Sequence, residues 1–285
     1  MDYQIIDDIE LIKELLSISS RELAGAIGVT PETLSRWCSS AQEISPENTE
    51  KIYDFAFSEG IRLNRIKEQL YKEDCISRNR IIIFHGAKNN IDGEISIDKS
   101  RELNDFGKGF YCGESLEQSA MFVSGFKGSS LYIYEFDKSS LLGTQFFCDR
   151  DWMLTIAYFR GRLTGYDEHP IIRELIRKID GKDYVSAPIA DNRMFEIIDS
   201  FIDGEITDVQ CQHCLSATNL GNQYVFKTEK AVRQLELKRH CYLSEREKKY
   251  YLTSKQEESK IGNDKVKIAR KQFRGQGKYI EDILK

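Results

Sequence analysis

The chain has 285 residues, of which 40% are hydrophobic and 31% are charged. These proportions are ordinary for a folded globular protein and exclude a chain that is disordered throughout. No apolar run approaches the roughly 18 residues that a membrane-spanning helix needs. The first four residues lack a basic segment before an apolar core, and the seven cysteines have no regular spacing. We therefore expect a cytoplasmic protein with reduced thiols, no secretory signal and no membrane partner.

The net charge of −5 hides a gradient along the chain. Residues 1–75 hold 8 basic and 15 acidic side chains, whereas residues 238–285 hold 14 basic and 7 acidic ones. A basic tail on an acidic body can bind nucleic acid, fold back on the body or form a solvated charged helix. We take the solvated helix as the default and keep the other two open.

Apolar residues recur at helical spacing through most of the first 75 residues. Ser19 and Glu22 have the spacing of a capping box, Gly28 is suited to end a helix, and Pro31 suits the first turn of the next one. The expected helices cover residues 7–16, 21–27, 31–37 and a segment that begins at Pro46.

The stretch from Ser19 to Trp37 resembles the helix-turn-helix of phage-repressor-type regulators. Its apolar residues are placed to form a small core, namely Leu23, Ala24, Ile27, Val29, Leu34 and Trp37. In that family the helix after the turn enters the major groove of DNA. Here that helix offers one cation, Arg36, beside Glu32, in a segment of net charge −7. Because phosphate neutralisation supplies most of the affinity for DNA, we keep two partners open: DNA and another protein surface.

Beyond a linker expected near residues 72–80, the pattern changes to short β-branched and aromatic runs. These runs predict strands over residues 81–86, 130–136, 183–190, 206–212 and 223–228. Helical spacing between them predicts helices over residues 115–122, 151–160, 169–180 and 194–202. The expected fold class is α+β, with a small all-helical domain over residues 1–72, a mixed domain over 80–240 and a basic helical tail over 241–285.

Three separated pieces of the mixed domain carry residues suited to chemistry. They are His85-Gly86 at the end of a predicted strand, the segment Asp105–Phe122 with its run Gly107–Tyr111, and Asn222–Phe226 on a late strand. Each piece is weak alone, because a glycine-rich turn is usually structural. Together and in this order they resemble the ADP-ribosyltransferase superfamily, in the branch that contains diphtheria toxin and the poly(ADP-ribose) polymerases. They are also similar to bacterial domains of this kind from toxin–antitoxin or phage-defence loci.

The resemblance implies a split β-sandwich fold, NAD as the substrate and no metal. The reaction breaks the bond between nicotinamide and ribose, through a transition state with positive charge on the ribose. By resemblance, the backbone of Gly86 and the hydroxyl of Ser119 hold the nicotinamide amide. Tyr111 and Phe122 stack on its ring, and His85 binds a ribose hydroxyl.

Gln223 stands where the family's pattern has glutamate. A carboxylate at this position stabilises the developing positive charge, whereas glutamine keeps a hydrogen bond without the charge. We therefore assign His85, Tyr111 and Gln223 as the catalytic residues of a mono-transferase and do not expect chain elongation. Asp191 and Glu229 are carboxylates that could compensate, and Asp191 is equally suited to cap a helix.

The cysteines allow one other arrangement. Cys211 and Cys214 form a Cys-x-x-Cys motif, and the pair His240-Cys241 follows. Cysteine pairs occur in zinc sites, but the two residues of the second pair are adjacent and would chelate awkwardly. We therefore expect plain reduced cysteines here.

The function expected from the sequence is transfer of ADP-ribose from NAD to a macromolecular acceptor, either protein or nucleic acid, by a bacterial toxin or defence effector. An antitoxin protein that masks the cleft is the expected regulator. The alternative is a DNA-binding regulator whose C-terminal domain binds NAD or ADP-ribose without catalysis.

Overall fold

The structure is a computed structural model that describes residues 3–76, 80–217 and 221–285. Contacts divide the chain into two compact units, each assembled from separated segments. The first unit comprises Met1–Asn90, Ser119–Glu135 and Leu237–Ser254, and the second comprises Ile91–Gln118, Phe136–Glu236 and Lys255–Lys285. Among the helices of the described residues, none combines the length and apolarity that crossing a bilayer requires.

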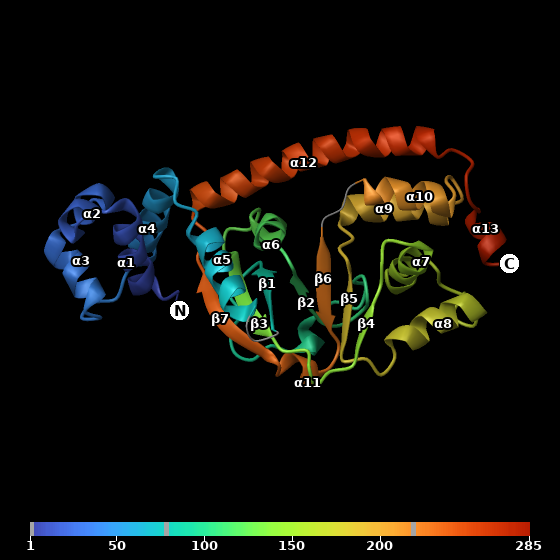
Figure 1. Ribbon diagram of the computed structural model, residues 1–285, viewed down its shortest axis with the longest axis horizontal. Coiled ribbons are helices and arrows are strands. Elements are labelled where there is room, and N and C mark those ends of the chain that lie inside the picture. The colour runs from blue at the N-terminus through green and yellow to red at the C-terminus, as the bar shows by residue number, and fades with distance from the viewer. Residues whose placement is uncertain (1–2, 77–79, 218–220) are drawn as a thin grey trace. The chain divides into compact units, whose positions relative to one another are not determined.

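Five helices begin the first unit (Figure 1). The first four confirm the predicted helices, whereas the fifth was not among them. Ser19 caps the second helix in a complete capping box with Glu22, and Gly28 ends it with a φ of 74°. Thr30 caps the third helix, with Pro31 in its first turn. The helices are α1 Ile5–Leu16, α2 Ser20–Ile27, α3 Pro31–Cys38, α4 Pro46–Ser58 and α5 Leu63–Ile76.

The expected helix-turn-helix core is present between α2 and α3. Leu23, Ala24, Ile27, Leu34 and Trp37 are all buried, and Val29 packs against them half-buried. Helix α5 continues to Ile76 and therefore covers the first part of the expected linker, while residues 77–79 of that linker lie outside the described residues.

Three strands complete the first unit: β1 Ile81–Ala87, β3 Ser130–Phe136 and most of β7 Leu235–Cys241. The first two confirm predicted strands, whereas β7 was missed because its sequence is charged. Tertiary partners neutralise those charges. Lys238 lies 3.4 Å from Glu135 of β3, and Arg239 lies 2.7 Å from Asp8 of α1.

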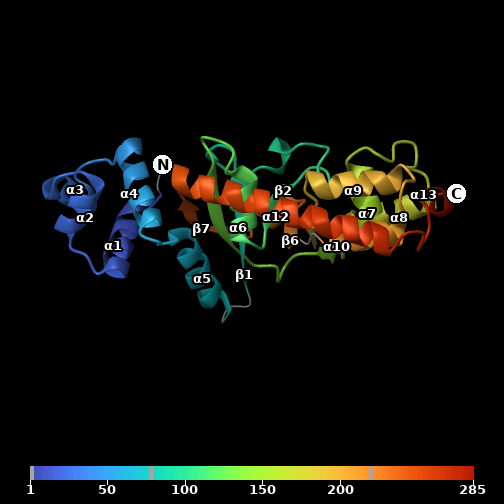
Figure 2. The same ribbon diagram turned by 90° about the horizontal axis from the view of Figure 1, so that it is seen from above.

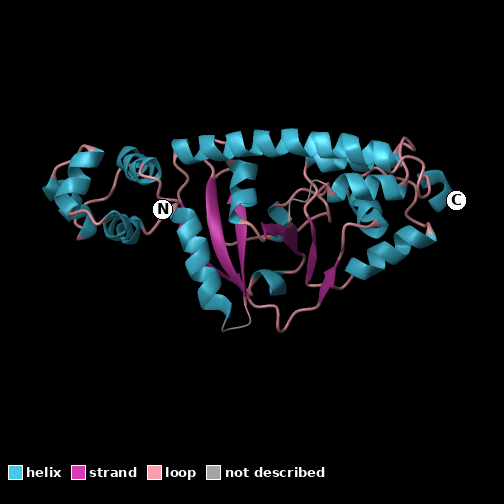
Figure 3. Ribbon diagram, turned by 45° about the horizontal axis from the view of Figure 1, so that its top comes forward, coloured by secondary structure: helices cyan, strands magenta, loops and turns pink. Residues whose placement is uncertain are grey.

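In the second unit, strands β4 Gly143–Gln145, β5 Tyr184–Pro188, β6 Asn222–Phe226 and β2 Phe110–Gly113 lie side by side in that order. The pair β4–β5 is parallel, and the pairs β5–β6 and β2–β6 are antiparallel, so the sheet is mixed. Figure 3 distinguishes these strands from the helices that accompany them. The helices are α7 Arg150–Phe159, α8 Pro170–Ile179, α9 Asn192–Ile202, α10 Asp208–Ser216, α11 Glu229–Val232 and α13 Ile280–Ile283, and Ile97–Lys99 form one 3₁₀ turn.

The strand predicted over residues 206–212 is wrong, because these residues enter helix α10. The Thr207 side chain accepts a hydrogen bond from the backbone N–H of Gln210 and so caps the helix. Helices α9 and α10 lie beside the second half of α12, Glu245–Gln272 (Figure 2). There Arg193 donates to the carbonyl of Ser259 at 3.0 Å, and Gln210 donates to that of Arg270 at 2.5 Å.

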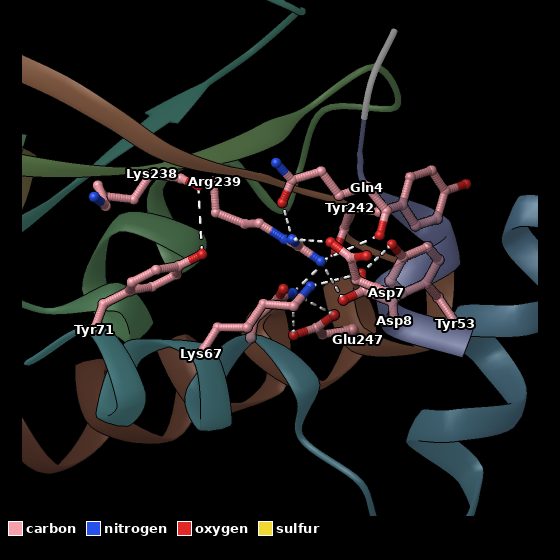
Figure 4. A network of polar contacts seen from close by, with 11 residues as sticks. Gln4, Asp7, Asp8, Tyr53, Lys67, Tyr71, Lys238, Arg239, Tyr242 and Glu247 are labelled. Carbon is pink, nitrogen blue, oxygen red and sulfur yellow. Dashed lines mark hydrogen bonds and ion pairs between the residues drawn. The ribbon is translucent and has the colours of Figure 1, made fainter. Parts of the chain in front are cut away.

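Buried charges join the N-terminal helices to the rest of the first unit (Figure 4). The Asp8 carboxylate lies 2.7 Å from Arg239 of β7 and 2.6 Å from Lys67 of α5, and Tyr53 donates to it at 2.5 Å. The network borders a cavity of about 350 Å³ between α1, α5 and β7. Outside it, Arg246 of α12 pairs with Asp54 at 2.9 Å. The basic C-terminal region therefore folds back, in part, on the acidic helices.

Glu247 of α12 belongs to the same network and provides a test of it. Its carboxylate accepts hydrogen bonds from Asn64 at 3.1 and 3.2 Å, and burial raises its pKa to about 7. Because this pKa is raised on folding, the folded state binds a proton more tightly than the unfolded chain. The resulting stabilisation is complete below about pH 4.5 and is lost as the pH rises through about 7.

We predict that the free energy of unfolding of the wild type falls by up to about 3 kcal/mol between pH 4.5 and 7.5, at about 1.4 kcal/mol per pKa unit. Glu247→Gln has no carboxyl group to titrate and should not show this fall. Urea unfolding at both pH values measures it. The control is Glu245→Gln, whose side chain is 68% exposed on the same helix and which should keep the wild-type slope. Equal slopes in wild type and Glu247→Gln would contradict the buried-carboxylate explanation.

Candidate functional site

Gly86 and Ser119, predicted to share one site, lie together in the first unit. Gly86 is in strand β1, and Ser119 is in helix α6, Leu116–Val123. A Cβ atom on residue 86 would lie 2.4 Å from the carbonyl oxygen of Ser119 and 3.0 Å from a methyl group of Val123. Glycine is therefore required by the close approach of the helix backbone to the strand.

The Ser119 side chain lies inside this contact, and its residue is 7% exposed. Its hydroxyl donates to the carbonyl of Phe84 in β1 at 3.3 Å, so its oxygen keeps acceptor capacity for a ligand. Phe122 follows on the same helix and is 45% exposed. The structure thus offers a hydroxyl and an accessible aromatic ring on one helix.

His85 points away from this helix. Successive side chains of a strand point to opposite faces, so the ring of His85 lies on the face of β1 opposite to that on which Gly86 meets α6. It lies 6.4 Å from the ring of Tyr132, which stacks on His240 of β7 at 4.3 Å. The first unit therefore brings Gly86 and Ser119 together and separates the His85 side chain from them.

Tyr111 and Gln223 lie in the second unit, on the paired strands β2 and β6. Tyr111 is opposite Val225, and Gly113 is opposite Gln223. Opposite residues of an antiparallel pair share a face, and the residue two positions away is a diagonal neighbour. Tyr111 and Gln223 therefore occupy the same face of this strand pair.

The phenol of Tyr111 is bound within its own motif. It donates to the carbonyl of Gly107 at 2.7 Å and accepts from the backbone N–H of Phe106 at 3.1 Å. Burial raises the pKa of Tyr111, so the phenol remains protonated at neutral pH. Its hydroxyl holds the turn at Gly107, whose φ of 70° favours glycine.

Lys227, which the sequence analysis did not single out, holds the same turn from the end of β6. Its ammonium donates to the carbonyls of Phe106 and Lys108, each at 2.5 Å. Burial lowers the pKa of Lys227 to about 8. The sequence did not mark this lysine, because the motif Asn222–Phe226 ends one residue before it.

Gln223 is 6% exposed, and its amide group contacts a carboxylate. The Nε2 atom donates to Oδ2 of Asp105 at 2.7 Å and to the carbonyl of Pro188 at 3.1 Å. Asp105 is itself 6% exposed and lies against the guanidinium of Arg160, whose Nε is 2.9 Å from Oδ1. Asp105 is the first residue of the motif segment Asp105–Phe122, yet nothing in the sequence linked it to Gln223 or to Arg160.

The carboxylates suggested as substitutes for glutamate have other positions. The Asp191 side chain accepts from the backbone N–H of Met194 at 2.8 Å and caps helix α9, so the helix-cap interpretation is confirmed. Glu229 begins the short helix α11. Among the described residues, Gln223 bonds to neither of them.

The paired cysteines lie one turn apart on α10, where both are buried. The Cys211 thiol donates to the carbonyl of Ile197 at 3.6 Å, and the Cys214 thiol donates to that of Val266 at 3.7 Å. Within the part of the chain that the structure describes, no group of three or more histidine, cysteine or acidic side chains could hold a metal ion.

Residues 81–237 match a family model whose description is "Protein of unknown function (DUF3990)". The match covers more than half of the chain. The chain belongs to the DUF3990 family. Searches of curated proteins and of solved structures found no match. The DUF3990 segment begins with β1, and every residue of the candidate site, including Asp105 and Arg160, lies inside it.

Because helix α6 approaches Gly86 so closely, a methyl group added at residue 86 should destabilise the fold. Gly86→Ala should lower the free energy of unfolding by about 1–3 kcal/mol, because the added Cβ meets helix backbone that must shift. Gly25→Ala is the control. Gly25 lies in helix α2 with nothing within 4 Å of an added Cβ, and the change should stabilise by about 0.5–1 kcal/mol. Urea unfolding of both variants measures the difference. Equal stability of Gly86→Ala and wild type would show that α6 does not approach β1 this closely.

Proposed function

We propose that this protein is a mono-ADP-ribosyltransferase, which transfers ADP-ribose from NAD to a macromolecular acceptor and releases nicotinamide. One observation carries the proposal. The resemblance assigns Gly86 and Ser119 to the nicotinamide amide, and the two residues come from separate segments of the chain. They are in close contact: a Cβ atom added at residue 86 would lie 2.4 Å from the carbonyl oxygen of Ser119. A resemblance without structural meaning gives no reason for these two residues to be neighbours.

The chemistry needs two kinds of contact. The nicotinamide amide needs a hydrogen-bond donor and an acceptor at fixed positions, which a strand backbone at Gly86 and the hydroxyl of Ser119 provide. The planar ring needs a stacking surface, and Phe122 is an accessible ring one turn after Ser119 on α6. Tyr111 is the second ring in this proposal. His85, whose side chain lies on the face of β1 opposite to Ser119, is assigned to the adenosine-side ribose and makes no contact with the nicotinamide group. Stacking adds about 0.5–1.5 kcal/mol beyond the buried area.

The transfer balances without a further reactant. The bond between C1′ of the ribose and N1 of nicotinamide breaks, and nicotinamide leaves with the electron pair. A nucleophilic oxygen or nitrogen of the acceptor forms the new bond to C1′ and releases its proton to solvent. The chain's residues contribute by holding the reacting atoms in place and by stabilising positive charge on the ribose.

Gln223 supports transfer of a single unit. A neutral amide accepts a hydrogen bond from a ribose hydroxyl but supplies no charge to activate a second ribose as the next acceptor. The antiparallel pair β2–β6, with Tyr111 and Gln223 on one face, is compatible with the split β-sandwich of the superfamily. The proposal includes that fold, and a cytoplasmic toxin or phage-defence effector restrained by an antitoxin protein.

A second candidate is a regulator that binds NAD or ADP-ribose without turnover and contacts DNA through α2 and α3. The contacts of Gln223 favour this second candidate. Its NH₂ group donates to Asp105 and to the Pro188 carbonyl, and its neutral amide brings no negative charge to stabilise a cationic ribose. The acidic character of the first helices opposes DNA binding. Nicotinamide release distinguishes the two candidates.

We predict that purified protein releases nicotinamide from NAD labelled in that ring. Ser119→Ala should raise the KM for NAD by about five- to tenfold, which corresponds to the loss of one hydrogen bond of about 1–1.5 kcal/mol. Ser124→Ala is the matched control, because Ser124 is also buried beside α6 and donates to the carbonyl of Ala120 at 2.6 Å. Its KM should remain within about twofold of wild type.

Two outcomes separate the candidates. NAD binding without nicotinamide release, tested with protein and nucleic-acid acceptors, would favour the regulator. If NAD neither binds nor reacts, both candidates are rejected.

A further inference from the structure

The orientation of the Gln223 side chain is determined by its neighbours. An amide group has a donor end and an acceptor end, and the ends are told apart by their hydrogen-bond partners. Here the two partners are the Asp105 carboxylate, at 2.7 Å, and the Pro188 carbonyl, at 3.1 Å. Both partners accept and neither donates, so the NH₂ end must face them. The carbonyl oxygen Oε1 therefore points elsewhere.

That oxygen has no partner within the described part of the chain. Gln223 as a residue is only 6% exposed, but Oε1 is not one of the buried side-chain atoms that lack a hydrogen-bond partner, so this oxygen remains accessible to solvent or to a ligand. An acceptor without a protein donor, on a buried side chain whose other end is held by two bonds, is a binding position for a ligand hydroxyl or N–H.

We propose that Asp105, held by Arg160, is a positioning residue that turns Oε1 of Gln223 toward a hydroxyl of the nicotinamide ribose. This inference rests on the proposed function. Asp105 acts through Gln223, since its carboxylate already accepts from Arg160, Gln223 and the backbone N–H of Ala190.

Arg160 keeps the carboxylate in place. Its guanidinium binds Oδ1 of Asp105 through Nε at 2.9 Å and also through Nη2. Nη2 donates as well to the carbonyl of Ala190 at 2.6 Å, and the guanidinium lies 4.3 Å from the centre of the Phe195 ring. A buried carboxylate needs such an opposite charge, and these contacts give the guanidinium one position.

The same geometry explains why residue 223 is glutamine. A glutamate there would place a second carboxylate where Nε2 now lies 2.7 Å from Asp105. Two buried carboxylates at that distance repel each other, and Arg160 already serves the first. Glutamine supplies the donor that Asp105 needs and retains an acceptor for the ligand.

Asp105→Asn tests the positioning role. In this variant the side-chain oxygen stays with Arg160, so an NH₂ group meets the NH₂ group of Gln223 and the hydrogen bond between the two side chains is lost. The Pro188 carbonyl opposes a reversal of the glutamine amide, so Oε1 is no longer held in one position toward the ribose. We expect kcat for nicotinamide release to fall by about tenfold or more, with KM changed by less than about threefold, because the contact matters most when positive charge develops. Asp151→Asn, at a half-exposed pair with Lys178 in the same unit, is the charge-matched control and should keep wild-type kcat.

The double variant Asp105→Asn/Gln223→Glu separates positioning from damage to the fold. It reverses the donor and the acceptor: the introduced asparagine donates, and the introduced glutamate accepts and offers its second oxygen to the ribose. We expect Gln223→Glu alone to lower the melting temperature and kcat. The double variant should recover part of the melting temperature and part of kcat, because the bond to residue 105 is restored while the Pro188 carbonyl stays without its donor. No recovery of kcat in a folded double variant would overturn the proposal.

NAD analogues that lack the 2′- or 3′-hydroxyl of the nicotinamide ribose identify the ligand group. One analogue should lower wild-type kcat by about the same factor as Asp105→Asn lowers it with NAD, and should cost Asp105→Asn much less. Full activity of Asp105→Asn with NAD would overturn the positioning role and leave the proposed function standing. Wild-type protein that neither binds NAD nor releases nicotinamide would overturn the proposed function, and the ribose assignment with it.

Discussion

A buried carboxylate at Asp105 constrains the second unit. An ionised group in the interior must be paired, because the loss of hydration is otherwise uncompensated. Asp105 obtains its partners from three separate segments: Arg160 at the end of α7, Ala190 after β5, and Gln223 in β6. One side chain therefore holds the loop before β2 to strand β6, to the residues that follow β5 and to the end of helix α7. The residue type at position 223 follows from the same requirement.

The first unit also contains a buried carboxylate, and this one is paired with two cations. Asp8 of α1 is fully buried between Arg239 of β7 and Lys67 of α5. These contacts explain part of the charge gradient along the chain, because acidic side chains of the early helices meet basic ones from near the C-terminal end. Helix α1 is consequently attached to β7 through Asp8 and Arg239, and helix α4 to α12 through Asp54 and Arg246.

Close backbone approach is the second constraint, and it concerns the candidate site directly. At Gly86, helix α6 comes so near to β1 that a methyl group does not fit. At Gly107, a left-handed turn is closed by the phenol of Tyr111 and by Lys227. Both glycines belong to the motifs that carry the family resemblance. Their geometry shows that these motifs encode backbone positions.

Local patterns in the sequence determined most of the elements. Apolar spacing, Ser19 with Glu22, and Pro31 determined the early helices, because caps and helix periodicity depend only on residues within a few positions. The strands at residues 81–86 and 130–136 were equally clear from their β-branched and aromatic residues. The sequence also singled out Gly86, Ser119, Tyr111 and Gln223, through motifs that are recognisable without a fold.

What the tertiary structure decided are the features that depend on partners far away in the chain. Strand β7 is charged and pairs its charges with α1 and β3, so no local pattern revealed it. Residues 206–212 resemble a strand but begin helix α10, whose Gln210 side chain donates to the carbonyl of Arg270, sixty residues further along the chain. The role of Asp105 became visible only in the folded chain, where it binds Arg160 and Gln223. A buried charge is stabilised by whatever the fold brings to it, and its own sequence neighbours do not specify that partner.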